Sequence, residues 1–319
     1  MLKFINRTIA FQWIILLALL ALSIYNILTK TEIGNVVGST FLYQSFAQFF
    51  SKYEYFGKGI IIAALLVQIL FLQYHFMKKE YVAKKSVLPA CFYLIILWLT
   101  KSLIIISPFF FTLLFFLIII SIDYNITQNQ MKNNAIWIGF LVAFATCLDV
   151  SAIIVLVLII VTLIINQFSK IREIGIVLFG FGLIYFYFFS YYFLTNQLID
   201  WIETFQQIRI GGILNSEITL HITTKISLAT LCIIYLYFMV RVRLISELKV
   251  ILQRKRIITL NIWAIIMLAC LFITNSAYPF YLGYFFALIA IYLAILAQES
   301  NPLYINELIT ISVLVALWL

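Results

Sequence analysis

Long apolar runs recur along the whole chain, and they limit the possible folds more than any other feature. The first run extends from Ile9 to about Leu28, and a helix needs about 20 such residues to cross the hydrocarbon core of a bilayer. Only 10% of the residues are charged, whereas soluble domains carry about 25%. The sequence therefore predicts an all-α fold, a polytopic transmembrane helical bundle that forms a single integral membrane domain over residues 1–319. About ten spans are expected, at about 9–28, 59–77, 87–100, 103–122, 135–148, 150–166, 174–194, 226–240, 257–274 and 280–297.

The runs differ in length. Those at 87–100 and 135–148 hold 14 residues each, so each helix would be about 21 Å long, which is shorter than the bilayer core. The last apolar stretch, 308–319, has 12 residues and is too short to cross. We expect it to be re-entrant, interfacial or packed against the bundle. Gly180 and Gly182, within one of the longer runs, indicate close packing between helices.

The basic residues indicate how the spans are oriented. With the N-terminus in the cytoplasm, 15 of the 21 Lys and Arg residues fall in inner segments and 6 in outer segments, as the positive-inside rule requires. The chain is therefore predicted to be a multi-pass protein of the inner (plasma) membrane with a cytoplasmic N-terminus. The same distribution explains the net charge of +9 without nucleic acid as a partner, and membrane lipids are the expected surroundings.

Residues 29–58 form the first large outer loop, and part of it has a helical pattern. Aromatic residues dominate one face, and polar residues such as Gln48 and Lys52 occupy the other. The spacings of three and four residues are typical of an amphipathic helix. Such a helix either lies in the membrane interface or only caps the bundle. The apolar face consists of Leu42, Phe46, Phe49, Phe50 and Tyr53.

Residues 195–225 form the second large outer loop. Its first part has another helical stripe, and the alternation of apolar and polar residues at 218–223 indicates an extended segment. Outer loops of this length are often functional. The sequence therefore predicts interfacial helices in both outer loops. The stripe of the second loop consists of Leu198, Trp201, Ile202 and Phe205.

Two carboxylates on the predicted outer side are the candidate catalytic residues. Glu32 lies just past the first span, and Asp149 lies between two apolar runs, where an ionisable residue is costly and suggests a function. The alternatives for Asp149 are a solvated turn or an ion pair with Lys101. Lys101, Arg209 and His221 lie on the same predicted side, and we expect them to be the substrate-binding residues.

No metal site and no cofactor are expected. The two histidines, His75 and His221, fall on opposite sides of the predicted bilayer and cannot share a metal ion. The four cysteines lie in separate apolar runs, so we expect them to act as small packing residues. The sequence also lacks the glycine-rich phosphate-binding motifs and the paired-histidine zinc motif.

Three segments carry a resemblance to a known family. They are FINRTIAFQWIILLALLAL near the start, QNQMKNNAIWIGFLVAF in the middle, and KIREIGIVLFGFGLIYFYFFSYYFL. In the last segment, Arg172 and Glu173 precede a span that contains Gly180. In this order the segments resemble an uncharacterised family of Bacteroidota multi-pass inner-membrane proteins, defined as a domain of unknown function. The resemblance covers most of the chain, and it implies the same fold and compartment.

One predicted function is a non-enzymatic membrane component. The chain would then be a scaffold of cell-envelope assembly or of lipid trafficking, with protein partners in an envelope complex. This function explains why the spans contain few polar groups. A transporter is the least expected function, because it needs more polar residues near the midplane than Asn26, Gln68 and Asn261 provide.

The alternative is an enzyme. The chain is distantly similar to membrane glycosyltransferases that use polyprenyl-linked sugars, which have amphipathic helices in the first outer loop and an acidic residue near its start, here Glu32. The similarity implies a general base on the periplasmic face and a polyprenyl-phosphate carrier as a partner.

Overall fold

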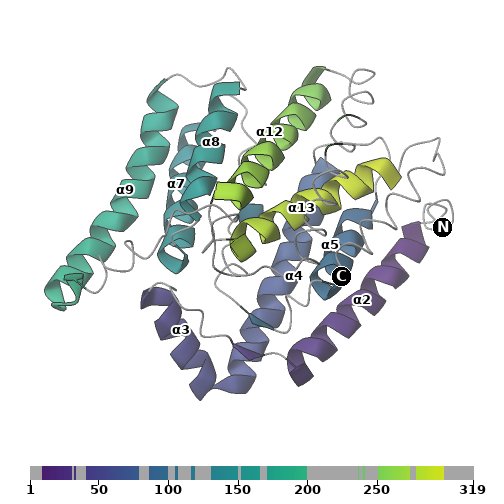
Figure 1. Ribbon diagram of the computed structural model, residues 1–319, viewed down its shortest axis with the longest axis horizontal. Helices are drawn as coiled ribbons and strands as arrows, with labels where there is room; N and C mark the ends of the chain where they lie inside the picture. Colours follow the sequence, from purple (N-terminus) through teal and green to yellow (C-terminus); the bar gives the residue numbers. More distant parts are fainter. Residues whose placement is uncertain are drawn as a thin grey trace.

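A computed structural model describes residues 9–30, 32–33, 41–78, 86–99, 105–106, 116–118, 131–149, 152–165, 171–199, 236, 240, 251–273 and 278–297. Helices dominate this part of the chain (Figure 1), and the predicted all-α class is confirmed there. They are α2 (Ile9–Lys30), α3 (Phe41–Lys52), α4 (Glu54–Lys78), α5 (Leu88–Leu99), α7 (Met131–Leu148), α8 (Ile153–Ile165), α9 (Ile171–Leu194), α12 (Ile251–Ile273) and α13 (Tyr278–Ala297). Two short strands, β1 (Glu32–Ile33) and β2 (Ile105–Ile106), follow α2 and α5.

Among the described residues, three helices are long and apolar enough to cross a membrane. They cover Ile9–Lys30, Glu54–Met77 and Arg172–Leu194. The structure therefore indicates a membrane protein with three candidate spans, fewer than the ten apolar runs of the sequence. Apart from residues 236 and 240, the predicted span at 226–240 lies outside the described residues, and so does the short apolar stretch 308–319. Shorter apolar helices cover Leu88–Trp98, Asn134–Leu148, Ile153–Ile164 and Ile257–Ala269.

The span predicted at 103–122 is wrong at its beginning. Ile105 and Ile106 form strand β2 instead of a helix. Their β-branched side chains favour extended backbone, and Ser107 precedes Pro108, which disfavours the helical conformation of the residue before it. The predicted helix is therefore interrupted at Ile105 and Ile106, whereas residues 116–118 further along are helical.

Paired contacts define the directions of the first helices. Gln12 Oε1, in the first turn of α2, accepts a hydrogen bond from Ser86 Oγ just before α5, at 3.0 Å. Beyond the other ends of these helices, β1 and β2 pair in parallel, so α2 and α5 run in the same direction. Helix α4 runs in the opposite direction. Gln73, late in α4, bonds to Ser86 just before α5, whereas Gln68, earlier in α4, bonds to Tyr93 further along α5.

The most closely packed pair of helices is α7 and α9, and these two also run in parallel. Gly139 packs against the backbone around Gly180, and nearer the carboxyl ends the Tyr185 hydroxyl donates to Thr146 Oγ1 at 2.9 Å. Figure 1 shows the carboxyl ends of α2, α7 and α9 on the same side of the molecule, where α3 also lies. We call this side the α3 end.

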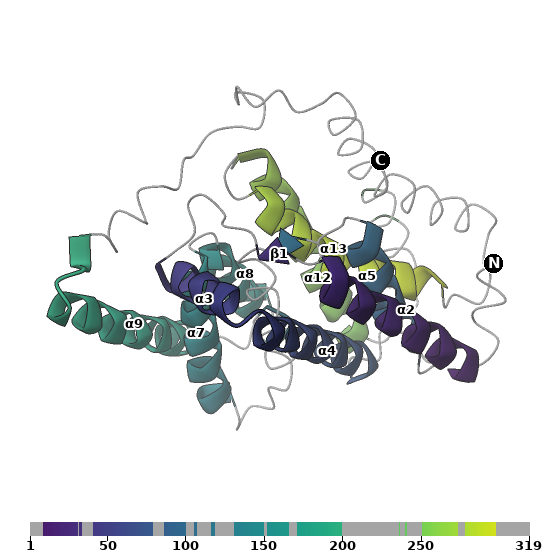
Figure 2. The same cartoon turned by 90° about the horizontal axis from the view of Figure 1, so that it is seen from below.

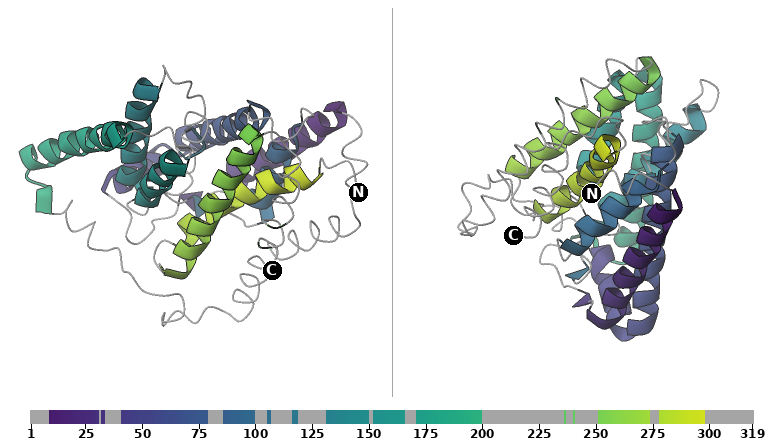
Figure 3. Two further views of the ribbon diagram at one scale, coloured as in Figure 1. Left: turned by 90° about the horizontal axis from the view of Figure 1, so that it is seen from above. Right: turned by 90° about the vertical axis from the view of Figure 1, so that its right-hand side faces the viewer.

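The helices form two groups, which are seen side by side in Figure 3. One group contains α7, α8 and α9, and the other contains α2, α4, α5, α12 and α13. In the second group α13 is enclosed, because every side chain from Ala287 to Ile295 is buried. The groups are joined where Trp263 of α12 donates to Thr162 of α8. By contrast α2 and α9 lie at the edges and expose many large apolar side chains.

Candidate functional site

Four elements meet at the α3 end: β1, β2, α3 and the carboxyl end of α7. The strands pair in parallel, with Glu32 opposite Ile105 and Ile33 opposite Ile106. Helix α3 contacts β1, α4 and α7, and Figure 2 shows it beside α7 and the start of α4. The candidate site is therefore this layer, in which α3 lies between the strand that carries Glu32 and the helix that precedes Asp149.

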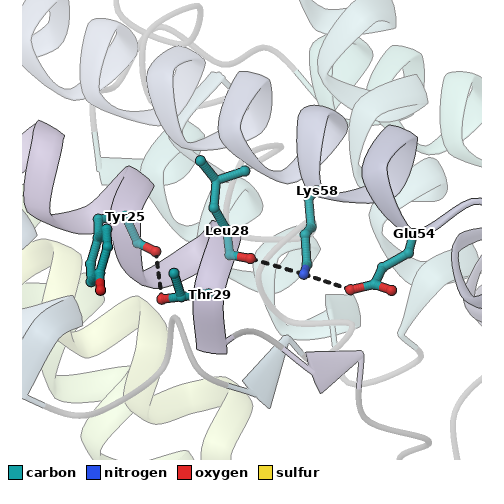
Figure 4. A network of polar contacts seen from close by, with 5 residues as sticks. All are labelled: Tyr25, Leu28, Thr29, Glu54 and Lys58. Atoms are coloured by element: carbon teal, nitrogen blue, oxygen red, sulfur yellow. Dashed lines mark hydrogen bonds and ion pairs between the residues drawn. The ribbon is translucent and has the colours of Figure 1, made fainter.

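A half-buried lysine, Lys58, fixes the end of α2 directly before Glu32 (Figure 4). Lys58 Nζ donates to the Leu28 carbonyl at 3.0 Å and to Glu54 Oε1 at 2.6 Å. The last carbonyls of a helix have no partner within the helix, and a cation there also interacts favourably with the helix dipole. The Lys58 side chain is 12% exposed, against 65% for that of Glu54, and both bonds of the Lys58 ammonium lie at the surface. Lys58 thereby ties the start of α4 to the segment that leads into β1.

The role of Lys58 was not predicted from the sequence, in which this lysine is only one of the basic residues of the outer segments. A signal was present, because Glu54 and Lys58 are four residues apart, which is the spacing of a stabilising pair on one helix face. The Leu28 carbonyl, in contrast, could not be identified, because it is 30 residues away in the chain.

Asp149 lies at the turn between α7 and α8. Its N–H donates to the Ala145 carbonyl at 2.9 Å, which continues the helical pattern of α7, and its carbonyl accepts from Ala152 N–H at 3.0 Å. The residue is partly buried. These backbone bonds place Asp149 directly after α7, in the connection to α8 at the α3 end.

The structure brings the two predicted catalytic residues to the same end of the molecule. Glu32 is described by its backbone in β1, and Asp149 by its place at the end of α7. The three predicted substrate-binding residues, Lys101, Arg209 and His221, lie outside the described residues. The ion pair between Asp149 and Lys101, and the roles of all five residues in chemistry, remain predictions.

The described residues offer no group of three His, Cys, Asp or Glu side chains that could hold a metal ion. His75 is buried near the carboxyl end of α4, and this end of the helix lies opposite to the α3 end. Cys91 and Cys147 are buried in α5 and α7, where they contribute to the packing between helices.

Polar side chains within the helices are used to join one helix to another. Gln68 of α4 accepts from the Tyr93 hydroxyl of α5 at 2.8 Å, and neither side chain is exposed. Asn261 of α12 accepts from the Tyr292 hydroxyl of α13. In an apolar environment, such bonds satisfy groups that would otherwise be costly to bury. Gln68 and Asn261, two of the three polar residues considered for a transport path, are thus engaged in helix packing.

Comparisons of the chain with protein-family models, with curated proteins and with solved structures find no match. The resemblance to the Bacteroidota membrane family stays a prediction from the three sequence segments.

Proposed function

We propose that the protein is a multi-pass component of the inner (plasma) membrane that acts as a scaffold for an envelope assembly or for lipid trafficking. The observation that carries this proposal is the use of the polar side chains in the helices. Gln68, Thr162 and Asn261 each bond to an aromatic side chain of a neighbouring helix. Polar groups arranged in this way stabilise a bundle and do not line a path for a solute.

The helix directions fit the predicted alternation of outward and inward spans, and the distribution of basic residues assigns the cytoplasmic side. A chain that starts in the cytoplasm and crosses at each apolar run has α2, α5, α7 and α9 leading outward and α4 leading inward. The contacts that make α2 parallel to α5, and α7 parallel to α9, fit this order. The α3 end then faces the periplasm, and the basic segments around Lys85 and Lys132 face the cytoplasm.

The orientation is tested with reporter fusions. We expect a reporter that is active only in the cytoplasm to work after Lys85, and a reporter that is active only outside to work after Asn215. The physical reason is the excess of basic residues in the inner segments. A matched pair of reporters at each site provides the control. Activity of the same reporter at both sites would contradict this orientation.

One observation favours a second candidate function, a transferase that uses a polyprenyl-linked sugar. Helix α3 contacts both β1, which contains Glu32, and α7, which leads to Asp149. A carboxylate at this place could act as a general base on an acceptor, while the polyprenyl-phosphate carrier lies among the helices. In this function the α3 end is an active site, whereas in the scaffold it is a binding face.

Neutral substitutions of the carboxylates separate the two functions. For the scaffold, we expect Glu32→Gln and Asp149→Asn to retain function in cells and to co-purify with protein partners, because each keeps the shape of the side chain. The measurement is complementation of a deletion strain, together with native purification. Gln48→Ala is the control, because Gln48 is an exposed polar residue at the same end. Loss of complementation in the first two variants alone, with a lipid-linked sugar in the preparation, would establish the transferase instead.

A further inference from the structure

The side chains of α3 and of Tyr53, which follows it, fall into three sectors around the helix axis. Successive residues are about 100° apart around a helix. One sector is buried and contains Ala47 and Phe50, which are 4% and 2% exposed. The next sector is aromatic, and the third is polar. The aromatic sector consists of Phe46, Phe49 and Tyr53, and the polar sector of Ser45, Gln48, Ser51 and Lys52.

The aromatic sector is a packed cluster that stays exposed. The ring of Phe49 lies 5.2 Å from that of Tyr53 and 5.9 Å from that of Phe56, the third residue of α4. Phe46, Phe49 and Tyr53 are nevertheless 44%, 42% and 49% exposed. Burial of aromatic side chains of this size is favourable, so we expect an apolar phase to cover a cluster of several.

The polar sector excludes full immersion in that apolar phase. Gln48 and Lys52 are exposed on the side of α3 away from the bundle core. The Lys52 ammonium lies 5.5 Å from the centre of the Tyr53 ring, where aromatic and polar sectors meet. A charged group in the hydrocarbon core is costly. Helix α3 therefore needs an apolar phase on one side and water or charged headgroups on the other.

We propose that α3 lies in the headgroup layer of the outer leaflet, with Phe46, Phe49 and Tyr53 toward the acyl chains and Lys52 toward the lipid phosphates. This inference rests on the proposed membrane function. Two observations favour lipid over a protein partner. The aromatic sector continues into exposed Tyr55 and Phe56 at the start of the candidate span α4, and Lys52 complements the charge of phosphate.

The position of α3 also defines the kind of ligand that the candidate site binds. Because α3 contacts β1 and α7, the backbone of Glu32 and the turn at Asp149 lie next to the same headgroup layer. A ligand that reaches them is an amphiphile with its polar head at the level of the phosphates and its chains among the lipids. Soluble solutes are not expected to bind there with comparable affinity.

Depth-dependent fluorescence quenching tests the inference in the full-length protein. The four native cysteines are replaced by alanine, and a single cysteine carrying a polarity-sensitive dye is placed by Phe49→Cys, Gln48→Cys or Leu70→Cys. Each variant is measured in nanodiscs of phosphatidylethanolamine and phosphatidylglycerol. Gln48 is the matched control, because it adjoins Phe49 but lies in the polar sector. Leu70, 67% exposed on α4, reports the hydrocarbon core.

We expect the dye at position 49 to be quenched severalfold more by lipids brominated near the glycerol than by aqueous iodide, and the dye at 48 to show the reverse. Equal quenching of both by iodide would place α3 in water and overturn the inference. Quenching at 49 mainly by bromine at the chain ends would place α3 in the core and overturn it as well. Lack of any lipid quenching at position 70 would contradict the proposed membrane function itself. Failure of that function is therefore distinguishable from failure of the position proposed for α3.

Discussion

Replacing Gly139 by alanine is expected to destabilise the protein by about 3 kcal/mol, because the added methyl group overpacks the contact between α7 and α9. A Cβ at this position would lie 2.3 Å from the Val177 carbonyl oxygen and 2.9 Å from the Phe181 nitrogen. Both are backbone atoms, which cannot rotate away as a side chain does. The two helices would have to separate, which would also break the hydrogen bond between Tyr185 and Thr146.

The partner glycine gives a second form of the same test. A Cβ on Gly180 would lie 2.8 Å from the Ile136 carbonyl oxygen, so Gly180→Ala is also expected to destabilise the protein. Once the helices have separated, the second substitution meets less resistance. The double variant Gly139→Ala/Gly180→Ala is therefore expected to lose less stability than the sum of the losses in the two single variants.

Two other glycines of α9 provide the control. A Cβ at Gly175 or Gly182 has nothing within 4 Å, and alanine is favoured over glycine in a helix by up to about 1 kcal/mol. Gly182→Ala is thus expected to leave stability unchanged or to raise it slightly. The measurement is unfolding by SDS in mixed micelles of one detergent. If Gly139→Ala and Gly182→Ala unfold at the same SDS fraction, the close contact between α7 and α9 is refuted.

The glycines also show how far the sequence determines the packing. Gly180 and Gly182 both indicate close approach of another helix, and the prediction is right for Gly180 only. Two residues that are two positions apart lie about 200° apart around a helix, so they cannot both face α7. Which of them does so depends on the rotation of α9, and an apolar sequence such as that of α9 does not encode the rotation, because its apolar residues are on all sides.

The same limit applies to the polar residues and to the site. Gln68 and Asn261 stand out as polar residues in apolar runs. Their tyrosine partners could not be identified from the sequence, because the chain contains 19 tyrosines. Helix α3 was predictable because its pattern distinguishes one face from the other. Strand β2 was not recognised, since the apolar run through it is long enough for a helix, and its pairing with β1 joins segments that are far apart in the chain.

Trp263 lies at the junction between the two groups of helices. Its side chain is 2% exposed, its ring centre is 5.6 Å from that of Phe116, and its Nε1–H donates to Thr162 Oγ1 at 2.5 Å. The Thr162 hydroxyl in turn donates to the Leu158 carbonyl at 2.8 Å. One side chain of α12 thus packs the core and bonds to α8.

Trp263→Ala is therefore expected to destabilise the protein by about 4 kcal/mol, through the cavity that it leaves and the lost hydrogen bond. Trp263→Phe retains much of the ring packing without the N–H group, so its effect is expected to be smaller. Trp137→Ala is the matched control. Trp137 is 60% exposed on α7, and its removal is expected to change stability by less than about 0.5 kcal/mol. SDS unfolding of the three variants measures these differences.

Similar losses from Trp263→Ala and Trp137→Ala would contradict the position of Trp263 in the core. A large loss from Trp263→Ala alone has a consequence for function as well. The α3 end is built from both groups of helices, since α3 contacts α4 in one group and α7 in the other. Separation at Trp263 is then expected to loosen the contacts of α3 with α4 and α7, so the accessibility of a dye at position 49 to iodide is expected to rise in the Trp263→Ala variant and to stay unchanged in Trp137→Ala.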